Sequence, residues 1–309
     1  TMDYLYYKAI NWDDIKDNFD KYTWEQLTTN FWLDIRIPVT NDQPAWQQLA
    51  DTQQQAITRM LAGASMLAVY QSEVGTPAIR HDRRTQQEES VLNTITFMKS
   101  VHAKSYTTIF RALIPGNGGA NFTWADNNTD LQAEIDQLAQ TSTNGTALQK
   151  KALFILTETG LSFGKYWTTL QTHSLVNTYQ MLANILRGSA IFSAYVGYKF
   201  HLGFEDLASS DQAELQHWIN TQFDQLMQTE KDFLEANLED ATEAINLAYY
   251  GANHALTSLG FDASYEVQPS PLVAQLKKLM IDQDQFLQQV TAANNESDTE
   301  EMTDDDYDF

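Results

Sequence analysis

Two ionisable side chains share one face of a long helical pattern. Val91, Ile95, Lys99, His102 and Tyr106 recur at steps of three or four residues. This spacing places them on a single side of an α-helix. The face is otherwise apolar, so the amine of Lys99 and the imidazole of His102 are candidate members of a buried polar site. A lone polar residue there is more often a satisfied core group, and the interpretation depends on partners from other helices.

Other helical patterns supply such partners. Glu158 lies in the middle of one apolar stripe and Ser189 lies in the middle of another. A third pattern carries a face of small residues that includes Ala68. The coincidence of several such positions in one predicted bundle favours a site over isolated core groups.

The spacing of these residues has a known chemical form. Carboxylate bundles bind two metal ions through a Glu from each of two helices and a Glu-x-x-His pair from each of two others. Lys99-x-x-His102 and Ser189-x-x-Phe192 keep this spacing and lack its glutamates. The pattern therefore predicts the frame of a dimetal site without most of its ligands.

Long helices must position these residues, because strand-like alternation is nearly absent. The periodicity predicts helices over 45–73, 86–113, 129–142, 146–170, 174–203, 210–234 and 237–260. The Gly and Asn content of 115–128 predicts a loop, with Asp126 or Asn128 capping the next helix. We expect an all-α, single-domain bundle over 1–285 and a flexible acidic tail over 286–309.

Composition excludes several classes of function. The chain has no cysteine, which removes disulfides, thiolate metal sites and thiyl chemistry. The net charge of −22, with no Lys or Arg in 296–309, argues against binding to nucleic acid or anionic membranes. No apolar run reaches about 18 residues and no signal pattern opens the chain. A cytoplasmic protein without a membrane span is expected.

Five segments carry a family resemblance: NFWLDIRIPVTNDQPAW (30–46), FMKSVHAKSYTTIF (97–110), LRGSAIFSAYVGYKF (186–200), ALTSLGFDASYEVQPSP (255–271) and TDDDYDF (303–309). In this order they resemble the small (beta) subunit of class Ib ribonucleotide reductase, a member of the ferritin-like superfamily. The resemblance covers nearly the whole chain. It implies a ferritin-like long-helix bundle that supports deoxyribonucleotide synthesis for DNA replication.

The resemblance also implies which metal ligands are missing. The family uses one Asp, three Glu and two His. Four of these six positions have changed and two are kept; the changed ones are Ala68, Lys99, Ser189 and Phe192, and the kept ones are His102 and Glu158. One carboxylate and one imidazole cannot hold two divalent metal ions. We therefore expect no dimetal centre and no bound metal.

Charge predicts what replaces the metals. Lys99 brings one positive charge to a site that keeps one carboxylate, Glu158. We expect the two side chains to form an ion pair in the vacated space, because an unpaired buried lysine is costly. The alternative is that Lys99 extends its amine to solvent.

The resemblance implies a radical on Tyr106, which matches the family's radical tyrosine. A metal-independent subgroup keeps a lysine at the position of Lys99, and one of its variants has a serine at that of Ser189. There the tyrosine is modified by hydroxylation with the help of a flavodoxin-like activator. This chain departs from that subgroup at Ala68, Glu158 and Phe192.

Radical transfer to the large subunit is only partly preserved. The resemblance assigns Trp32 to the relay, whereas the relay aspartate is replaced by Gly188 and the tail's relay tyrosine has no counterpart. Family members dock to the large subunit through their last residues. Here Tyr307 and Phe309 are the expected aromatic anchors, with Asp306 supplying charge. The family also implies a homodimer.

Three functions remain open from the sequence. The first is an atypical, metal-free small subunit of ribonucleoside-diphosphate reductase with a tyrosine-derived radical. The second is an inactive paralogue that binds the large subunit, or an active small subunit, and regulates assembly. The third, a dimetal oxidase of altered specificity, is disfavoured by the lost ligands. Retained Tyr106, Trp32 and the tail favour the first, and Gly188 favours the second.

Overall fold

The described part of the chain is a bundle of α-helices without strands. The structure, a computed structural model, describes residues 9–80, 85–116 and 118–280. Its long helices are α1 (Asn18–Thr29), α3 (Asp51–Tyr70), α5 (Gln86–Leu113), α7 (Thr129–Asn144), α8 (Ala147–Glu158), α10 (Val176–Glu205), α11 (Ser209–Asn237) and α12 (Thr242–Ser258). Shorter helices are α2 (Gln43–Gln47), α4 (Thr76–Ile79), α6 (Gly118–Asp126), α9 (Trp167–Gln171) and α13 (Pro271–Leu279). The expected all-α bundle is confirmed for these residues.

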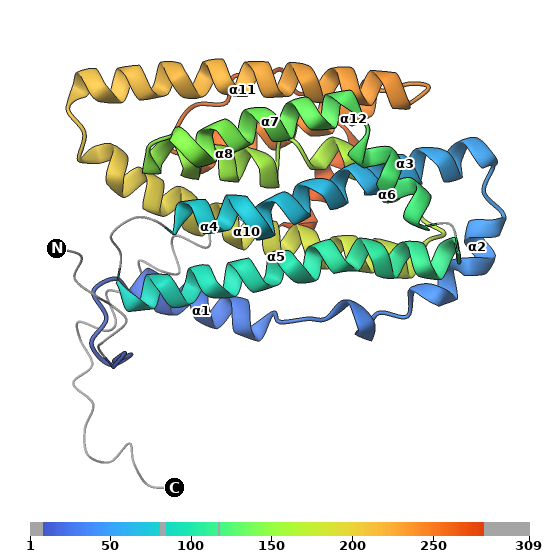
Figure 1. Cartoon of the computed structure of the whole chain (residues 1–309), viewed down its shortest axis with the longest axis horizontal. Coiled ribbons are helices and arrows are strands. Elements are labelled where there is room, and N and C mark those ends of the chain that lie inside the picture. Colours follow the sequence, from blue (N-terminus) through green and yellow to red (C-terminus); the bar gives the residue numbers. More distant parts are fainter. Residues whose placement is uncertain (1–8, 81–84, 117, 281–309) are drawn as a thin grey trace, which may run out of the picture.

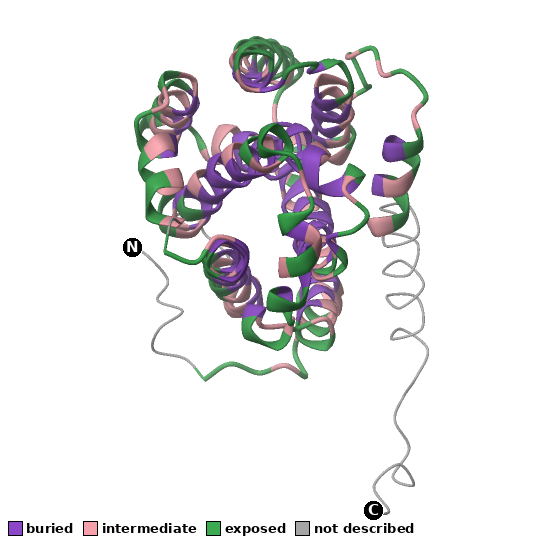
Figure 2. Ribbon diagram, turned by 90° about the vertical axis from the view of Figure 1, so that its right-hand side faces the viewer, coloured by how far each residue is buried: buried purple, intermediate pink, exposed green. Residues whose placement is uncertain are grey.

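Four helices form the centre of the bundle. In Figure 1, α3 and α5 run side by side, with α10 behind them and α8 between these helices and α11. Their apolar faces point inward, and buried residues line the interior of the bundle (Figure 2). Burial of such amphipathic faces, more than helix propensity, stabilises helices of this length. None of the described helices has the length and apolarity that crossing a membrane requires.

Local signals explain the bounds of α5, which carries most of the predicted stripe. Thr85 caps its first turn by accepting a hydrogen bond from the amide of Glu88. The acidic residues Glu88 and Glu89 in this turn interact favourably with the positive end of the helix dipole. Pro115 follows its C-cap, Ile114, where a proline disfavours further helix. Lys99, His102 and Tyr106 are all buried, as their spacing predicts.

The helix predicted over 146–170 is wrong beyond its first half. It ends at Glu158, and a turn and a 3₁₀ segment (Phe163–Tyr166) precede α9. Side chains that compete for backbone groups cause the break. Thr159 Oγ1 donates to the carbonyl of Gly251 at 2.8 Å, and Ser162 Oγ donates to that of Thr157 at 2.7 Å. The chain therefore leaves the helix axis directly after Glu158.

The predicted loop over 115–128 is also wrong in part, because α6 forms within it. Phe122 packs against Phe110 at 5.1 Å between ring centroids, and Trp124 packs against Phe233 at 6.3 Å. Tertiary burial of these aromatic rings outweighs the low helix propensity of the Gly and Asn residues. The predicted cap Asn128 is confirmed, since its side chain accepts from the amide of Leu131 at 3.0 Å.

Candidate functional site

An ion pair occupies the centre of the four-helix core. Lys99 Nζ lies 2.9 Å from Glu158 Oε1, and the two side chains are 6% and 1% exposed. The pair that charge predicts is therefore confirmed, and Lys99 does not extend to solvent. In a medium of low dielectric constant the two charges compensate each other, and neither could be removed alone without a large cost.

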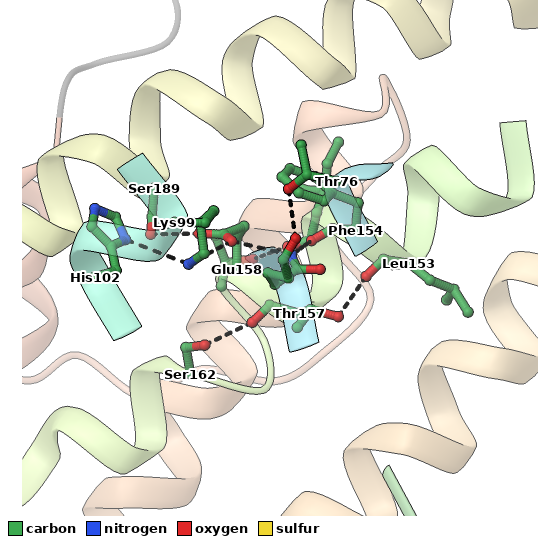
Figure 3. A network of polar contacts seen from close by, with 12 residues as sticks. Thr76, Lys99, His102, Leu153, Phe154, Thr157, Glu158, Ser162 and Ser189 are labelled. Carbon is green, nitrogen blue, oxygen red and sulfur yellow. Dashed lines mark hydrogen bonds and ion pairs between the residues drawn. The ribbon is translucent and has the colours of Figure 1, made fainter. Parts of the chain in front are cut away.

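Glu158 has hydrogen-bond partners on both of its oxygens (Figure 3). Ser189 Oγ donates to Oε2 at 2.7 Å, and Gln71 Nε2 donates to Oε1 at 3.1 Å. Gln71 also donates to the carbonyl of Phe154 at 3.0 Å. The carboxylate is thus held by three side chains from three different helical segments, and its charge is balanced by Lys99.

A turn of π-helix places Gln71 in the core. The segment η4 (Gln71–Gly75) continues α3 with one widened turn, a local feature that often occurs at functional sites. Gly75 leaves room for the Gln71 side chain in its present position, because a Cβ at residue 75 would lie 2.1 Å from Gln71 Oε1. Sequence reasoning missed Gln71, although this glycine four residues later was a visible signal.

His102 lies on the other side of Lys99 and is neutral. Its Nδ1 is 3.4 Å from Lys99 Nζ. Burial, followed by the charge of Lys99, lowers the pKa of His102 well below its usual range. The amine can only donate, so Nδ1 accepts and Nε2 carries the ring proton. Nε2 has no hydrogen-bond partner among the described residues. The imidazole stacks between Trp32 and Phe192, at centroid distances of 5.8 and 5.6 Å.

The two remaining positions of the predicted frame carry no donor atoms. Ala68 and Phe192 are buried at the same site, 4% and 1% exposed. A pair of divalent metal ions requires several oxygen and imidazole donors. The only carboxylate among these six positions already binds an ammonium group, and the only imidazole faces that same group. The residues present do not fit a dimetal centre.

Tyr106 lies one turn beyond His102 and contacts a second buried phenol. Its hydroxyl oxygen is 3.2 Å from that of Tyr166, which lies in the 3₁₀ segment η5 (Phe163–Tyr166). Burial raises the pKa values of both phenols, that of Tyr106 well above its usual range. Both are neutral phenols at physiological pH. Sequence reasoning missed Tyr166 because the predicted continuous helix would have carried it away from Tyr106.

The relay positions lie beside His102, but they are not connected by hydrogen bonds. Trp32 is half-buried and stacks on the imidazole. Gly188 packs against the same ring so closely that an added Cβ would be 3.0 Å from His102 Nε2. The structure thus brings Trp32, His102 and Gly188 together, and residues 9–80, 85–116 and 118–280 provide no acceptor for the Nε2 proton. Tyr307, Phe309 and Asp306 lie outside the described residues.

A second group of buried charges was not predicted. Lys165 Nζ contacts Glu230 Oε2, lies 3.5 Å from Glu134 Oε2 and donates to the carbonyl of Leu161 at 2.7 Å. All three charged side chains are fully buried. Burial and the neighbouring Glu134 raise the pKa of Glu230 well above its usual range. Glu230 therefore holds its proton more strongly than a carboxyl group in water.

Replacing Lys165 with methionine should destabilise the protein by about 3–5 kcal/mol, because it leaves two buried carboxyl groups without their cation. The pKa of Glu230 is raised in the folded state, so its contribution to stability is present at low pH and is lost as pH rises. The difference in unfolding free energy between the wild type and the variant should thus be larger at pH 8 than at pH 5. Urea denaturation at both pH values measures it, and an equal deficit at both would contradict this account.

The bundle and its four-helix site belong to the ferritin-like class of carboxylate proteins. The model of the family "Ribonucleotide reductase, small chain" matches residues 9–271. The beta subunit of ribonucleoside-diphosphate reductase 2 from Escherichia coli K12 is 32% identical over 280 residues, covering 86% of this chain and 87% of that protein. The beta subunit from Mycoplasmoides gallisepticum is 31% identical and covers 98% of this chain and 92% of its own length.

A solved structure agrees with these relatives. The dimanganese(II)-NrdF of Streptococcus sanguinis superposes with a TM-score of 0.85 and 36% identity, over 88% of this chain and 99% of that one. The chain belongs to the ribonucleotide reductase small-chain family. It is a small subunit of an enzyme of deoxyribonucleotide synthesis.

Proposed function

We propose that the chain is a metal-free small subunit of ribonucleoside-diphosphate reductase that carries its radical on Tyr106. The Lys99–Glu158 ion pair supports this proposal most directly. The ammonium group supplies the positive charge that metal ions supply elsewhere, and Ser189 and Gln71 satisfy the rest of the carboxylate. The radical residue keeps the full burial that protects a phenoxyl group from solvent.

The oxidation of Tyr106 must then come from outside the site. We propose a flavodoxin-like activator that delivers an oxygen-derived oxidant, and a hydroxylated Tyr106 as its product. Reductase turnover with the cognate large subunit tests the function, and mass spectrometry of the peptide that contains Tyr106 tests the modification. Turnover that requires added manganese or iron would contradict the proposal.

A non-catalytic regulator is the second candidate, and one observation favours it. The proton on His102 Nε2 has no acceptor among the described residues, and Gly188 removes the carboxylate that would connect it to Trp32. Proton-coupled transfer needs such hydrogen-bonded partners. A chain that binds the large subunit tightly but gives no turnover under any activation would establish this alternative.

We propose that the large subunit binds the C-terminal residues of the cytoplasmic small subunit. Tyr307 and Phe309 provide aromatic anchors, and Asp306 adds charge complementarity. A peptide of residues 295–309 should inhibit assembly in competition with the full chain, as measured by fluorescence anisotropy. The same peptide with alanine at Tyr307 and Phe309 serves as the control. Equal inhibition by both peptides, or by neither, would contradict this docking mode.

We also propose a homodimer, packed through the outer face of α3 and α5. Val69 of α3 and Val74 of the adjoining η4 are each 39% exposed, and they line a groove of about 620 Å³ with Ala103 of α5. Exposed apolar side chains around a groove are typical of a protein interface. Val69→Glu should convert the dimer to a monomer in sedimentation velocity, because it would bury an unpaired charge. A variant that remains dimeric would place the interface elsewhere.

A further inference from the structure

Tyr106 and Tyr166 form an isolated pair of phenols in the core. Their oxygens are 3.2 Å apart, and the side chains come from α5 and from the irregular segment after α8. Tyr106 is 1% and Tyr166 is 4% exposed. If Tyr166 only filled space, a phenylalanine would do the same and would bury no hydroxyl group that needs a hydrogen bond. The hydroxyl of Tyr166 therefore indicates a role beyond packing.

The hydrogen bond between the two phenols can run in either direction. Each phenol oxygen can both donate and accept, and either one can be the donor across the 3.2 Å contact. Ser162 Oγ, close to Tyr166 along the chain, donates its own proton to the carbonyl of Thr157 at 2.7 Å. An orientation in which the hydroxyl of Tyr166 donates to the oxygen of Tyr106 is therefore open.

Charge separation is disfavoured in this part of the core. Burial raises the pKa values of both phenols, and the nearby carboxylate of Glu158 adds to the increase. A phenolate or a protonated phenol would therefore be costly. A neutral hydrogen atom, which moves a proton and an electron together, can cross between the oxygens without that cost.

We propose that Tyr166 is a second radical-bearing residue, which exchanges a hydrogen atom with Tyr106. The inference rests on the proposed function, whose oxidant removes one hydrogen atom from the pair. The O–H bond of Tyr166 then breaks as the O–H bond of Tyr106 forms, and the unpaired electron moves from the Tyr106 oxygen to that of Tyr166. Atoms and charge balance without any further reactant, and the two states differ in which ring carries the unpaired electron.

Electron paramagnetic resonance can distinguish a radical on Tyr166 from a purely structural role of this residue. Tyr166→Phe removes one oxygen atom and keeps the ring. In the wild-type protein, the electron paramagnetic resonance signal should contain two phenoxyl components, one from each ring, with different β-methylene hyperfine couplings. In Tyr166→Phe, one component should be lost and the lowest-field g-value of the other should rise, because its hydrogen bond is gone.

The test uses the full chain, isolated with its cognate large subunit and activating system, with tyrosines deuterated at the β-carbon to identify the couplings. Tyr70→Phe is the matched control, since Tyr70 is also buried and its hydroxyl lies 2.6 Å from Ser142 Oγ. That variant should keep both components. A wild-type signal that Tyr166→Phe leaves unchanged overturns this inference alone. The absence of any phenoxyl radical signal from the wild type overturns the proposed function, and the inference with it.

Discussion

Replacing Lys99 with methionine should destabilise the protein by about 3–5 kcal/mol, the usual cost of leaving a buried charge without its partner. The reason is that Glu158, 1% exposed, would lose the cation with which it is paired. Urea denaturation followed by circular dichroism measures the change in the free energy of unfolding. Lys231→Met is the matched control, because Lys231 pairs with Glu235 on the surface of α11 and such pairs contribute only about 0.3–0.5 kcal/mol.

A second substitution distinguishes an ion pair from simple packing. In the double variant Lys99→Met with Glu158→Gln, the uncharged amide can accept from Gln71 through its oxygen and donate to Ser189 Oγ through its nitrogen. It should recover most of the lost stability, giving a large interaction energy in a double-mutant cycle. If the losses of unfolding free energy in the two single variants simply added up in the double variant, the pairing of Lys99 with Glu158 would not be the source of the destabilisation.

Tyr106→Phe should abolish reductase activity while the chain still folds and binds the large subunit. The substitution removes only the oxygen that would carry the radical and keeps the buried ring. Turnover with the cognate large subunit should fall to the level of that subunit alone. Affinity for the large subunit, measured in the same preparation, should be unchanged.

Tyr70→Phe is the control for this prediction. It also removes the hydroxyl of a buried tyrosine, but that hydroxyl forms its hydrogen bond with Ser142 and not with the proposed radical pair. It should lose some stability and keep its activity. Activity that survives in Tyr106→Phe would assign the radical elsewhere or establish a different function for the chain.

Most of the fold follows from the helical periodicity, because long amphipathic stripes specify both the helices and the faces that meet. The Lys99–Glu158 pair could be predicted for the same reason. The spacing places Lys99 on the buried face of α5, Glu158 is the carboxylate kept nearby, and a buried amine needs an anion. Both features depend on local spacing and on elementary electrostatics.

The features that sequence reasoning missed depend on breaks in regular structure. Tyr166 reaches Tyr106 only because α8 stops at Glu158, where competing side-chain hydrogen bonds end the helix. Gln71 reaches Glu158 only from a π-helical turn. Lys165 meets Glu134 and Glu230 through segments far apart in the sequence. No periodic pattern specifies such contacts, since each arises from tertiary packing.

The central claim is that an ammonium group replaces metal ions at this site. Its most direct test is to measure metal content and reductase turnover in the same preparation, before and after incubation with manganese(II) or iron(II). The account predicts activity at far less than one metal ion per chain, and no gain on adding metal. Turnover that rises in proportion to bound manganese or iron, reaching its maximum at two ions per chain, would contradict it.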